Sequence, residues 1–107
     1  AYGRNVSPEW SEALLAAHPA IAQAFVHGEA LPQAVALLVP RDPALTDTAL
    51  AAAVDAVNAQ LPEYARIAAF RRVPPFRAED GTLTANGRLR RREIHARHAE
   101  ALTDLSA

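Results

Sequence analysis

The feature that most constrains the fold is an apolar run, residues 34–39, which contains no polar side chain and ends at Pro40. A strand with apolar side chains on both faces leaves neither face for water, so this run predicts the central strand of a sheet covered on both sides. Residues 20–27 predict a neighbouring strand. The turn region at residues 28–32 separates the two, so we expect them to form a hairpin.

The segment before these strands predicts a helix. The sequence SPE at residues 7–9 is typical of a helix start, because serine can cap free amides, proline suits the first helical position and glutamate favours the positive end of the helix dipole. Trp10, Leu14 and Ala17 then recur along one face. We expect this face to be buried and the helix to end at the HP dipeptide that follows.

The second half of the chain predicts a helix, a strand and a last helix. A helix that Thr46 or Asp47 can cap is expected before Pro62. Its apolar residues recur at helical spacing, namely Leu50, Val54, Val57 and Leu61. Residues 65–73 predict the third strand, and residues 90–102 have the composition of a last helix. The whole order predicts an α+β fold in which helices cover a small, mixed, three-stranded sheet.

Length and composition limit the class of protein. The 107 residues suit one domain with a modest core. The chain has no cysteine, which excludes disulfides, thiolate nucleophiles and thiolate metal ligands. No apolar run approaches the roughly 20 residues that span a bilayer, and the N-terminal residues lack the apolar core of a signal peptide. We therefore expect a soluble, cytoplasmic protein without a membrane span.

Positive charge is concentrated in one part of the chain, which has no lysine. Residues 1–70 hold three arginines and seven acidic residues, residues 71–97 hold eight and three, and residues 98–107 hold none and two. Such a basic stretch is typical of proteins that bind nucleic acid, a membrane surface or a phosphorylated ligand. Only Phe70 and Phe76 are aromatic residues near the arginines, which gives base stacking little support. We expect a small phosphorylated ligand or an acidic partner, not nucleic acid.

The arginines gather around a glycine turn in the sequence LTANGRLRRR, residues 83–92. A guanidinium donates two parallel hydrogen bonds to a phosphate or a carboxylate, so a glycine loop that carries one is suited to hold either group. Gly87 and Arg88 are therefore candidate site residues. The other interpretation is a solvated turn before a helix whose arginines, at residues 90–92, face water or contact a partner domain. A further turn is expected at the DG dipeptide upstream.

Other reactive or large side chains have simpler explanations. His95 and His98 stand three apart on the last predicted helix, a spacing that can place two imidazoles on one face for a metal. Because no third ligand is evident nearby, we expect no metal site. Ser7 has no histidine partner at readable spacing, so we expect it to cap a helix and not to act as a nucleophile. Trp10 is expected to be a core or interdomain anchor.

Three segments, taken in order, resemble a known family. They are GRNVSPEWSE at residues 3–12, HPAIAQAFVHG at residues 18–28 and LTANGRLRR at residues 83–91. They are similar to the V-S/A-P-x-x-I-E, H-P-x-V-x-x-A-x-V-x-G and T-x-x-G-K-x-x-R motifs of the C-terminal lid subdomain of AMP-forming acyl ligases, the adenylate-forming superfamily. The resemblance covers essentially the whole chain, so residues 1–107 are expected to be one lid subdomain.

Further segments narrow the resemblance to the long-chain fatty acyl-CoA synthetase branch. The segments that look most like this branch are residues 28–32, 35–39, 57–61 and 79–84. The resemblance then implies a fatty acid, or another carboxylic acid, as the substrate.

The resemblance implies a two-step reaction shared between two domains. A large N-terminal adenylation domain, absent from these residues, binds ATP with its magnesium ion and a carboxylic acid, and the lid closes to give acyl-AMP and pyrophosphate. The lid then rotates so that residues near the family's glycine line a tunnel for the pantetheine thiol of CoA or of an acyl carrier protein. Arg88 matches the family's catalytic lysine, and Gly87 the glycine before it. Gly3 matches the tunnel glycine and is followed by Arg4 and Asn5, so these three and Gly87 are the expected cofactor-binding residues.

The arginine at position 88 departs from the family's lysine. Arginine keeps the positive charge that stabilises a developing negative charge on the α-phosphate, but it is bulkier and forked. Adenylation can therefore be retained, slowed or lost. Two alternatives stay open: a degenerate, non-catalytic lid kept for structure, and a stand-alone binding module whose arginine-rich segment docks an acidic carrier protein or a nucleic acid.

Overall fold

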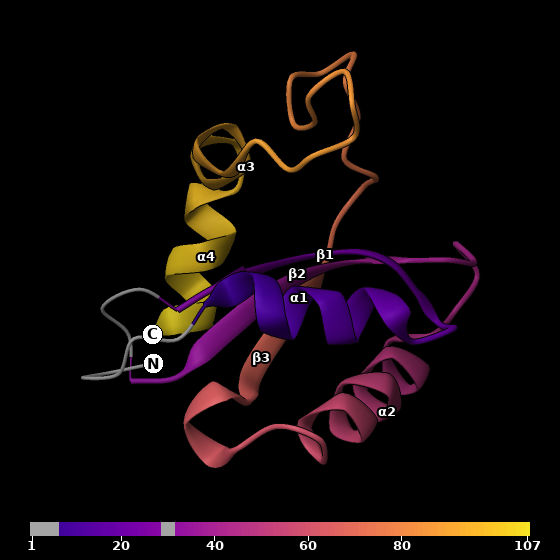
Figure 1. Ribbon diagram of the computed structural model, residues 1–107, viewed down its shortest axis with the longest axis vertical. Coiled ribbons are helices and arrows are strands. Elements are labelled where there is room, and N and C mark those ends of the chain that lie inside the picture. The colour runs from indigo at the N-terminus through magenta and orange to yellow at the C-terminus, as the bar shows by residue number, and fades with distance from the viewer. Residues whose placement is uncertain (1–6, 29–31) are drawn as a thin grey trace.

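The apolar run forms the central strand of the sheet, as predicted. In the computed structural model, which describes residues 7–28 and 32–107, strand β2 (Ala34–Pro40) pairs antiparallel with β1 (Ile21–His27) and parallel with β3 (Ile67–Arg72). The sheet order is β1-β2-β3 (Figure 1). The predicted hairpin and the predicted mixed, three-stranded α+β sheet are both confirmed.

Helices lie on both faces of this sheet. Their bounds are α1 Pro8–Ala17, α2 Asp47–Asn58, the short 3-10 helix η1 Glu63–Ala65, α3 Arg91–Arg97 and α4 Ala99–Ser106. Helices α1 and α2 share one face, and α3 and α4 lie across the sheet from them (Figure 1). Helix α2 makes the crossover that a parallel strand pair requires. Within the described ranges, no helix has the length and apolarity needed to cross a membrane.

Each face of β2 belongs to a separate hydrophobic core, because successive side chains of a strand point to opposite faces. Ala36 and Leu38 lie in the core that α1 and α2 cover. Leu37 lies in the opposite core with Ile94 of α3 and Leu102 of α4. Full burial of a leucine side chain contributes about 1.5–3 kcal/mol. Since Leu37 and Leu38 are both fully buried, β2 ties the two helical layers together.

Helix α2 follows the predicted pattern. Thr46, not Asp47, is the N-cap residue, and its hydroxyl oxygen accepts a hydrogen bond from the backbone N–H of Ala49 at 3.1 Å. The buried residues are those expected from the spacing, namely Leu50, Val54, Val57 and, after the helix, Leu61. The apolar period of this segment was therefore sufficient to predict which side packs on the sheet.

The buried face of α1 differs from the prediction. The buried residues are Ser11, Glu12 and Leu15. Trp10 is 44% exposed and Ala17 is exposed, so the expectation that they line the buried face is wrong. The two polar residues can turn inward because both find partners: Ser11 donates to a backbone carbonyl, and Glu12 Oε2 accepts from the N–H of Val26 at 2.6 Å. Trp10 is therefore no core anchor, and its role as an interdomain anchor stays a prediction.

Ser7 occupies the N-cap position of α1, as predicted, but its side chain does not cap the backbone. Its hydroxyl donates instead to the Glu9 carboxylate at 2.5 Å. This hydrogen bond is the main reason that the pKa of Glu9 is lowered from its ordinary value.

The single helix predicted over residues 90–102 is wrong, because His98 interrupts it. The dihedral angles of His98 are φ −113° and ψ 23°, outside the helical range, and α3 and α4 point in different directions on either side of it (Figure 1). The change of direction lays α4 along β2 and β3, where Leu102 is buried. Tertiary packing thus overrides helical propensity at this position.

Candidate functional site

The segment between β3 and α3, residues 73–90, forms an excursion away from the sheet (Figure 1). It contains two glycines with positive φ, Gly81 at 83° and Gly87 at 84°. Both values lie in the left-handed region that glycine adopts at little cost. The turn expected at the DG dipeptide and the turn expected before Arg88 are therefore both present, one after the other.

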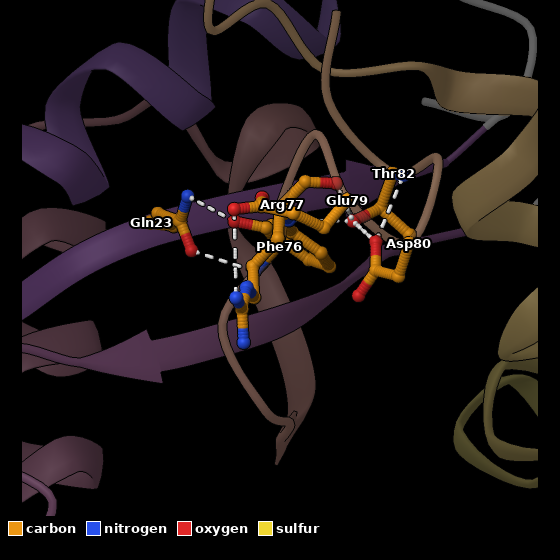
Figure 2. A network of polar contacts seen from close by, with 6 residues as sticks. All are labelled: Gln23, Phe76, Arg77, Glu79, Asp80 and Thr82. Atoms are coloured by element: carbon orange, nitrogen blue, oxygen red, sulfur yellow. Dashed lines mark hydrogen bonds and ion pairs between the residues drawn. The ribbon is translucent and has the colours of Figure 1, made fainter.

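The base of the excursion is fastened to the edge of β1 by the Gln23 side chain. The Gln23 amide accepts from the N–H of Phe76 at 2.8 Å and donates to the carbonyl of Phe76 at 3.2 Å (Figure 2). The N–H of Val73 also donates to the carbonyl of Leu38 at 2.9 Å. Phe76 itself is buried in the second core. The excursion therefore leaves the sheet from a fixed point.

The first turn is held together by the buried hydroxyl of Thr82. This oxygen accepts from the N–H of Arg77 at 2.8 Å and donates to Asp80 Oδ1 at 2.5 Å (Figure 2). The Asp80 carboxylate also accepts from the N–H of Thr82 at 3.0 Å. These hydrogen bonds, the side-chain one first, lower the pKa of Asp80 below its ordinary value. Arg97 of α3 donates to the Asp80 carbonyl at 2.9 Å and joins the turn to the helix.

The second turn is a small hairpin with Arg88 at its exit. Leu83 and Leu89 form an antiparallel bridge, and the N–H of Thr84 donates to the carbonyl of Arg88 at 2.8 Å. The Thr84 hydroxyl accepts in turn from the N–H of Arg88 at 3.0 Å. A side chain placed at Gly87 would meet nothing within 4 Å, so only the positive φ requires glycine there.

The guanidinium of Arg88 is exposed and, among residues 7–28 and 32–107, makes no hydrogen bond or ion pair. The backbone of Arg88 is thus fixed while its charge is available to a group outside the domain. The predicted role of Arg88 in binding a phosphate or a carboxylate stays a prediction. Gly87 precedes Arg88 in the turn, and its cofactor-binding role stays a prediction.

Arg91, the first residue of α3, is engaged inside the domain. Its Nη1 donates to Glu12 Oε1 at 3.0 Å, and its Nη2 lies 2.9 Å from Glu12 Oε2. Nη2 also donates to the carbonyl of Val26 at 2.7 Å, and the guanidinium carbon lies 4.6 Å from the centre of the Phe25 ring. The expectation that the arginines at 90–92 face water or a partner domain is therefore wrong for Arg91.

Reasoning from the sequence missed this pair. Glu12 and Arg91 are 79 residues apart, and nothing in a single sequence joins positions at that distance. The sequence holds only an indirect indication that the two residues matter: each of them ends one of the motifs that carry the family resemblance. Glu12 closes the motif that starts the first helix, and Arg91 closes the motif that contains Arg88.

Three predicted site residues, Gly3, Arg4 and Asn5, lie outside the described residues. Their expected contact with the pantetheine arm stays a prediction.

Three histidines make ring contacts on the sheet and on helix α3 or at its end. The His95 and His27 rings are 5.0 Å apart between centroids and nearly perpendicular, at 70°. His98 lies against the Phe76 ring, at 6.3 Å, and burial is the first cause that lowers its pKa. In the part of the chain that the structure describes, no group of three or more His, Cys, Asp or Glu side chains could hold a metal ion.

A family model decides the class of this domain. The chain matches the AMP-binding enzyme C-terminal domain over residues 1–106. The chain belongs to this family. The resemblance to the adenylate-forming superfamily is thus confirmed.

Solved structures share the fold of this AMP-binding enzyme C-terminal domain. The A domain of a carboxylic acid reductase from Segniliparus rugosus, in complex with AMP and a co-purified carboxylic acid, is 26% identical with a TM-score of 0.83, covering 94% of this chain and 18% of that chain. The adenylation domain of the carboxylate reductase from Mycobacterium chelonae is 24% identical with a TM-score of 0.82, over 94% and 18%. An acyl-CoA synthetase from Brucella canis is 21% identical with a TM-score of 0.70, over 92% and 18%.

The matches cover most of this chain but only a small part of the chains of those structures. Because this chain spans 18% of each of those three chains, the domain is joined in them to a much longer remainder. In the carboxylate reductases that remainder belongs to the same adenylation domain. No curated protein sequence matches the chain.

Proposed function

We propose that the chain is the mobile C-terminal domain of an ATP-dependent ligase, which activates a carboxylic acid as acyl-AMP and transfers the acyl group to a phosphopantetheine thiol. ATP, its magnesium ion and the acid bind to an N-terminal adenylation domain of the same protein, in the cytoplasm, where ATP and CoA are available. The observation that carries the proposal is Arg88. Its charge is exposed and has no hydrogen-bond or ion-pair partner within the described ranges, and its backbone is held on a hydrogen-bonded hairpin.

In the first step, a carboxylate oxygen attacks the α-phosphorus of ATP, the bond to the bridging oxygen of pyrophosphate breaks, and pyrophosphate leaves. Negative charge develops on the α-phosphate, and a preorganised cation there lowers the barrier more than it stabilises the substrate. Arg88 is proposed to supply this cation, with its two parallel N–H groups directed at the α-phosphate and the acyl carboxylate.

In the second step, the domain rotates, the thiol sulfur attacks the acyl carbon, the bond to the phosphate oxygen of AMP breaks and AMP leaves. Gly3, with Arg4 and Asn5, is proposed to let the pantetheine arm approach. A similar structure is the A-PCP didomain of carboxylic acid reductase from Segniliparus rugosus in complex with AMP, 25% identical with a TM-score of 0.82 over 92% of this chain and 16% of that chain. This likeness supports a carrier protein as one acceptor, beside CoA.

The acid is proposed from the sequence segments that resemble the long-chain fatty acyl-CoA synthetase branch. The similar structures include enzymes that act on other acids. One is the anthranilate CoA ligase AuaEII in complex with anthranoyl-AMP, which is 22% identical with a TM-score of 0.69 over 91% of this chain and 19% of that chain. A fatty acid is therefore the first substrate to test, and an aromatic acid the second.

The stand-alone binding module has less support from the arginines. Arg72, Arg91 and Arg97 each donate to a backbone carbonyl of the domain itself. Part of the basic segment thus serves the fold and is not available to a nucleic acid. An acidic carrier protein needs fewer free charges than a nucleic acid, so it is the version of this alternative that stays open.

The experiment that tests the proposal measures acid-dependent exchange of pyrophosphate into ATP in the full-length protein. Arg88→Ala should lower this exchange by about 100-fold or more. Arg92→Ala is the matched control, because Arg92 is a second exposed arginine of the same segment for which the described residues supply no hydrogen bond or ion pair. Unchanged exchange in Arg88→Ala would reject the catalytic role. A large gain in Arg88→Lys would support the degenerate lid.

A further inference from the structure

The Glu12–Arg91 pair is a charged contact that the proposed reaction does not use. The Glu12 side chain is 10% exposed and that of Arg91 is 34% exposed. Removing charges from water is costly, and a buried ion pair is often no more stable than apolar residues in its place. A pair of this kind is better explained by the geometry that it imposes than by the stability that it adds. The question is which geometry depends on it.

The pair fixes the start of α3 on the edge of the sheet. Glu12 Oε2 accepts from the N–H of Val26, and Arg91 Nη2 donates to the carbonyl of Val26. The N–H and the carbonyl of one strand residue point to the same side of the strand. Because β1 is an edge strand, the Glu12 and Arg91 side chains bond these two groups of Val26 in the way that a neighbouring strand would. These contacts hold the side chain of Arg91 at Val26 of β1.

The backbone between Arg91 and Arg88 is held by hydrogen bonds along its whole length. Only two residues intervene, and both are bonded: Leu89 bridges to Leu83, and the N–H of Arg90 donates to the carbonyl of Thr82 at 2.9 Å. A shift of Arg91 along β1 is consequently transmitted to the hairpin and to Arg88. On the other side the hairpin is held by the Thr82 hydrogen bonds.

We infer that Glu12 and Arg91 are positioning residues for Arg88, which set where the hairpin stands relative to the sheet. The inference rests on the proposed function of Arg88 and adds a place in the fold at which its geometry is controlled. A displacement of about 1 Å of a charged group can cost about 100-fold in rate. The pair should therefore matter for the adenylation step, in which Arg88 acts, and not for thiol transfer.

Glu12→Gln in the full-length protein tests the inference. Glutamine keeps the shape and one oxygen to accept from Val26, but it loses the charge and the two-point contact with Arg91. We expect pyrophosphate exchange to fall at least about tenfold through kcat, with the KM for ATP nearly constant. Thioester formation from supplied acyl-AMP should stay within about twofold.

A double-mutant cycle separates positioning from general damage. In the Arg88→Ala background, Glu12→Gln should cause no further loss of exchange, because it acts through Arg88. Additive losses, or equal losses in both half-reactions, would overturn the inference. Asp47→Asn is the matched control, since it removes another ion pair, with Arg72 at 3.1 Å, on the side of the domain that carries α2. It should change neither half-reaction.

Two further measurements keep the test decisive. If Glu12→Gln lowers the folded fraction, Arg91→Lys is used in its place, because lysine keeps the positive charge but lacks the forked guanidinium. We then expect a smaller fall in pyrophosphate exchange, again with nearly unchanged thioester formation. In the 107-residue chain, amide hydrogen exchange at Gly87 and Arg88 should become faster in Glu12→Gln and stay unchanged in Asp47→Asn. If the rate of amide hydrogen exchange at Gly87 and Arg88 were unchanged in both variants, the inference would be contradicted.

The outcomes distinguish the two proposals. If Arg88→Ala leaves adenylation intact, the proposed function of Arg88 fails. If Arg88→Ala abolishes adenylation while Glu12→Gln leaves it intact, the role of Arg88 stands and the positioning inference fails.

Discussion

The two glycine turns of the 73–90 segment have the same backbone requirement and opposite surroundings. Gly81 and Gly87 differ by one degree in φ, 83° against 84°. Thr82, next to the first glycine, is 1% exposed and fully hydrogen-bonded, whereas Arg88, next to the second, is exposed. A positive-φ glycine thus shows only where the chain turns. Whether the turn supports the fold or leaves a charged group exposed depends on what the neighbouring side chains meet.

The largest expected effect is a loss of adenylation, with nearly unchanged folding stability, when the charge at the second turn is removed. Arg88→Ala should lower adenylation by about 100-fold or more and leave the free energy of unfolding within about 0.5 kcal/mol, because the side chain is exposed and has no partner in the described ranges. Urea titration of the chain and pyrophosphate exchange by the full-length protein check the two parts. A clear loss of stability would mean that the second turn also supports the fold.

The next effect concerns stability at the first turn. Thr82→Val keeps the side-chain shape and removes a buried hydroxyl, which leaves the N–H of Arg77 without its partner. The free energy of unfolding should fall by about 1–3 kcal/mol. Thr84→Val is the matched change in the second turn, and it should cost about 0.5–1.5 kcal/mol, because water can replace the hydroxyl there. Equal losses in urea titrations of the two variants would erase the distinction between the turns.

Alanine at the glycines should produce similar stability losses and different functional ones. Gly81→Ala and Gly87→Ala each place a Cβ at positive φ, which costs about 1–2 kcal/mol. Neither Cβ meets a close neighbour: the nearest atom to that of residue 81 is Arg90 Nη1 at 3.7 Å, and that of residue 87 has none within 4 Å. Thermal unfolding should therefore shift alike in both. Gly87→Ala should also lower adenylation, and a larger kinetic loss in Gly81→Ala would contradict the comparison.

The smallest effect is the acid dependence of the first turn. Hydrogen bonds from Thr82 lower the pKa of Asp80, so the folded state favours the ionised carboxylate. This contribution is present above the ordinary aspartate pKa of about 3.9 and is lost as the pH falls through the lowered value. Asp80→Asn should therefore flatten the stability of the chain between neutral and acid pH. Parallel melts of both proteins check this, and identical pH profiles would show that Asp80 contributes nothing.

Local patterns in the sequence were sufficient for much of the fold. The apolar run of β2 required a covered central strand, and the spacing of Leu50, Val54 and Val57 placed one face of α2 on the sheet. The turn glycines were readable because few other residues adopt positive φ. The family followed from motifs at three places in the chain, and they included the position of Arg88.

Other features could not be read from the sequence because they depend on partners far along the chain. The inward face of α1 was predicted from Trp10, yet Glu12 is buried, since Arg91 and Val26 supply its hydrogen bonds. The break at His98 likewise depends on how α4 meets the sheet. Neither has a local signal.

The sequence by itself determined the strand order at the hairpin, the covered sheet, the turns and the family, because each is encoded within a few consecutive residues or in a short motif. Only the tertiary structure decided which arginines are bonded within the domain and which leave their charge exposed. Arg91 and Arg88 stand three residues apart with the same side chain, and one is bonded to Glu12 and Val26 while the other faces outward. A charge acquires its role from the atoms around it, and these come from distant parts of the chain.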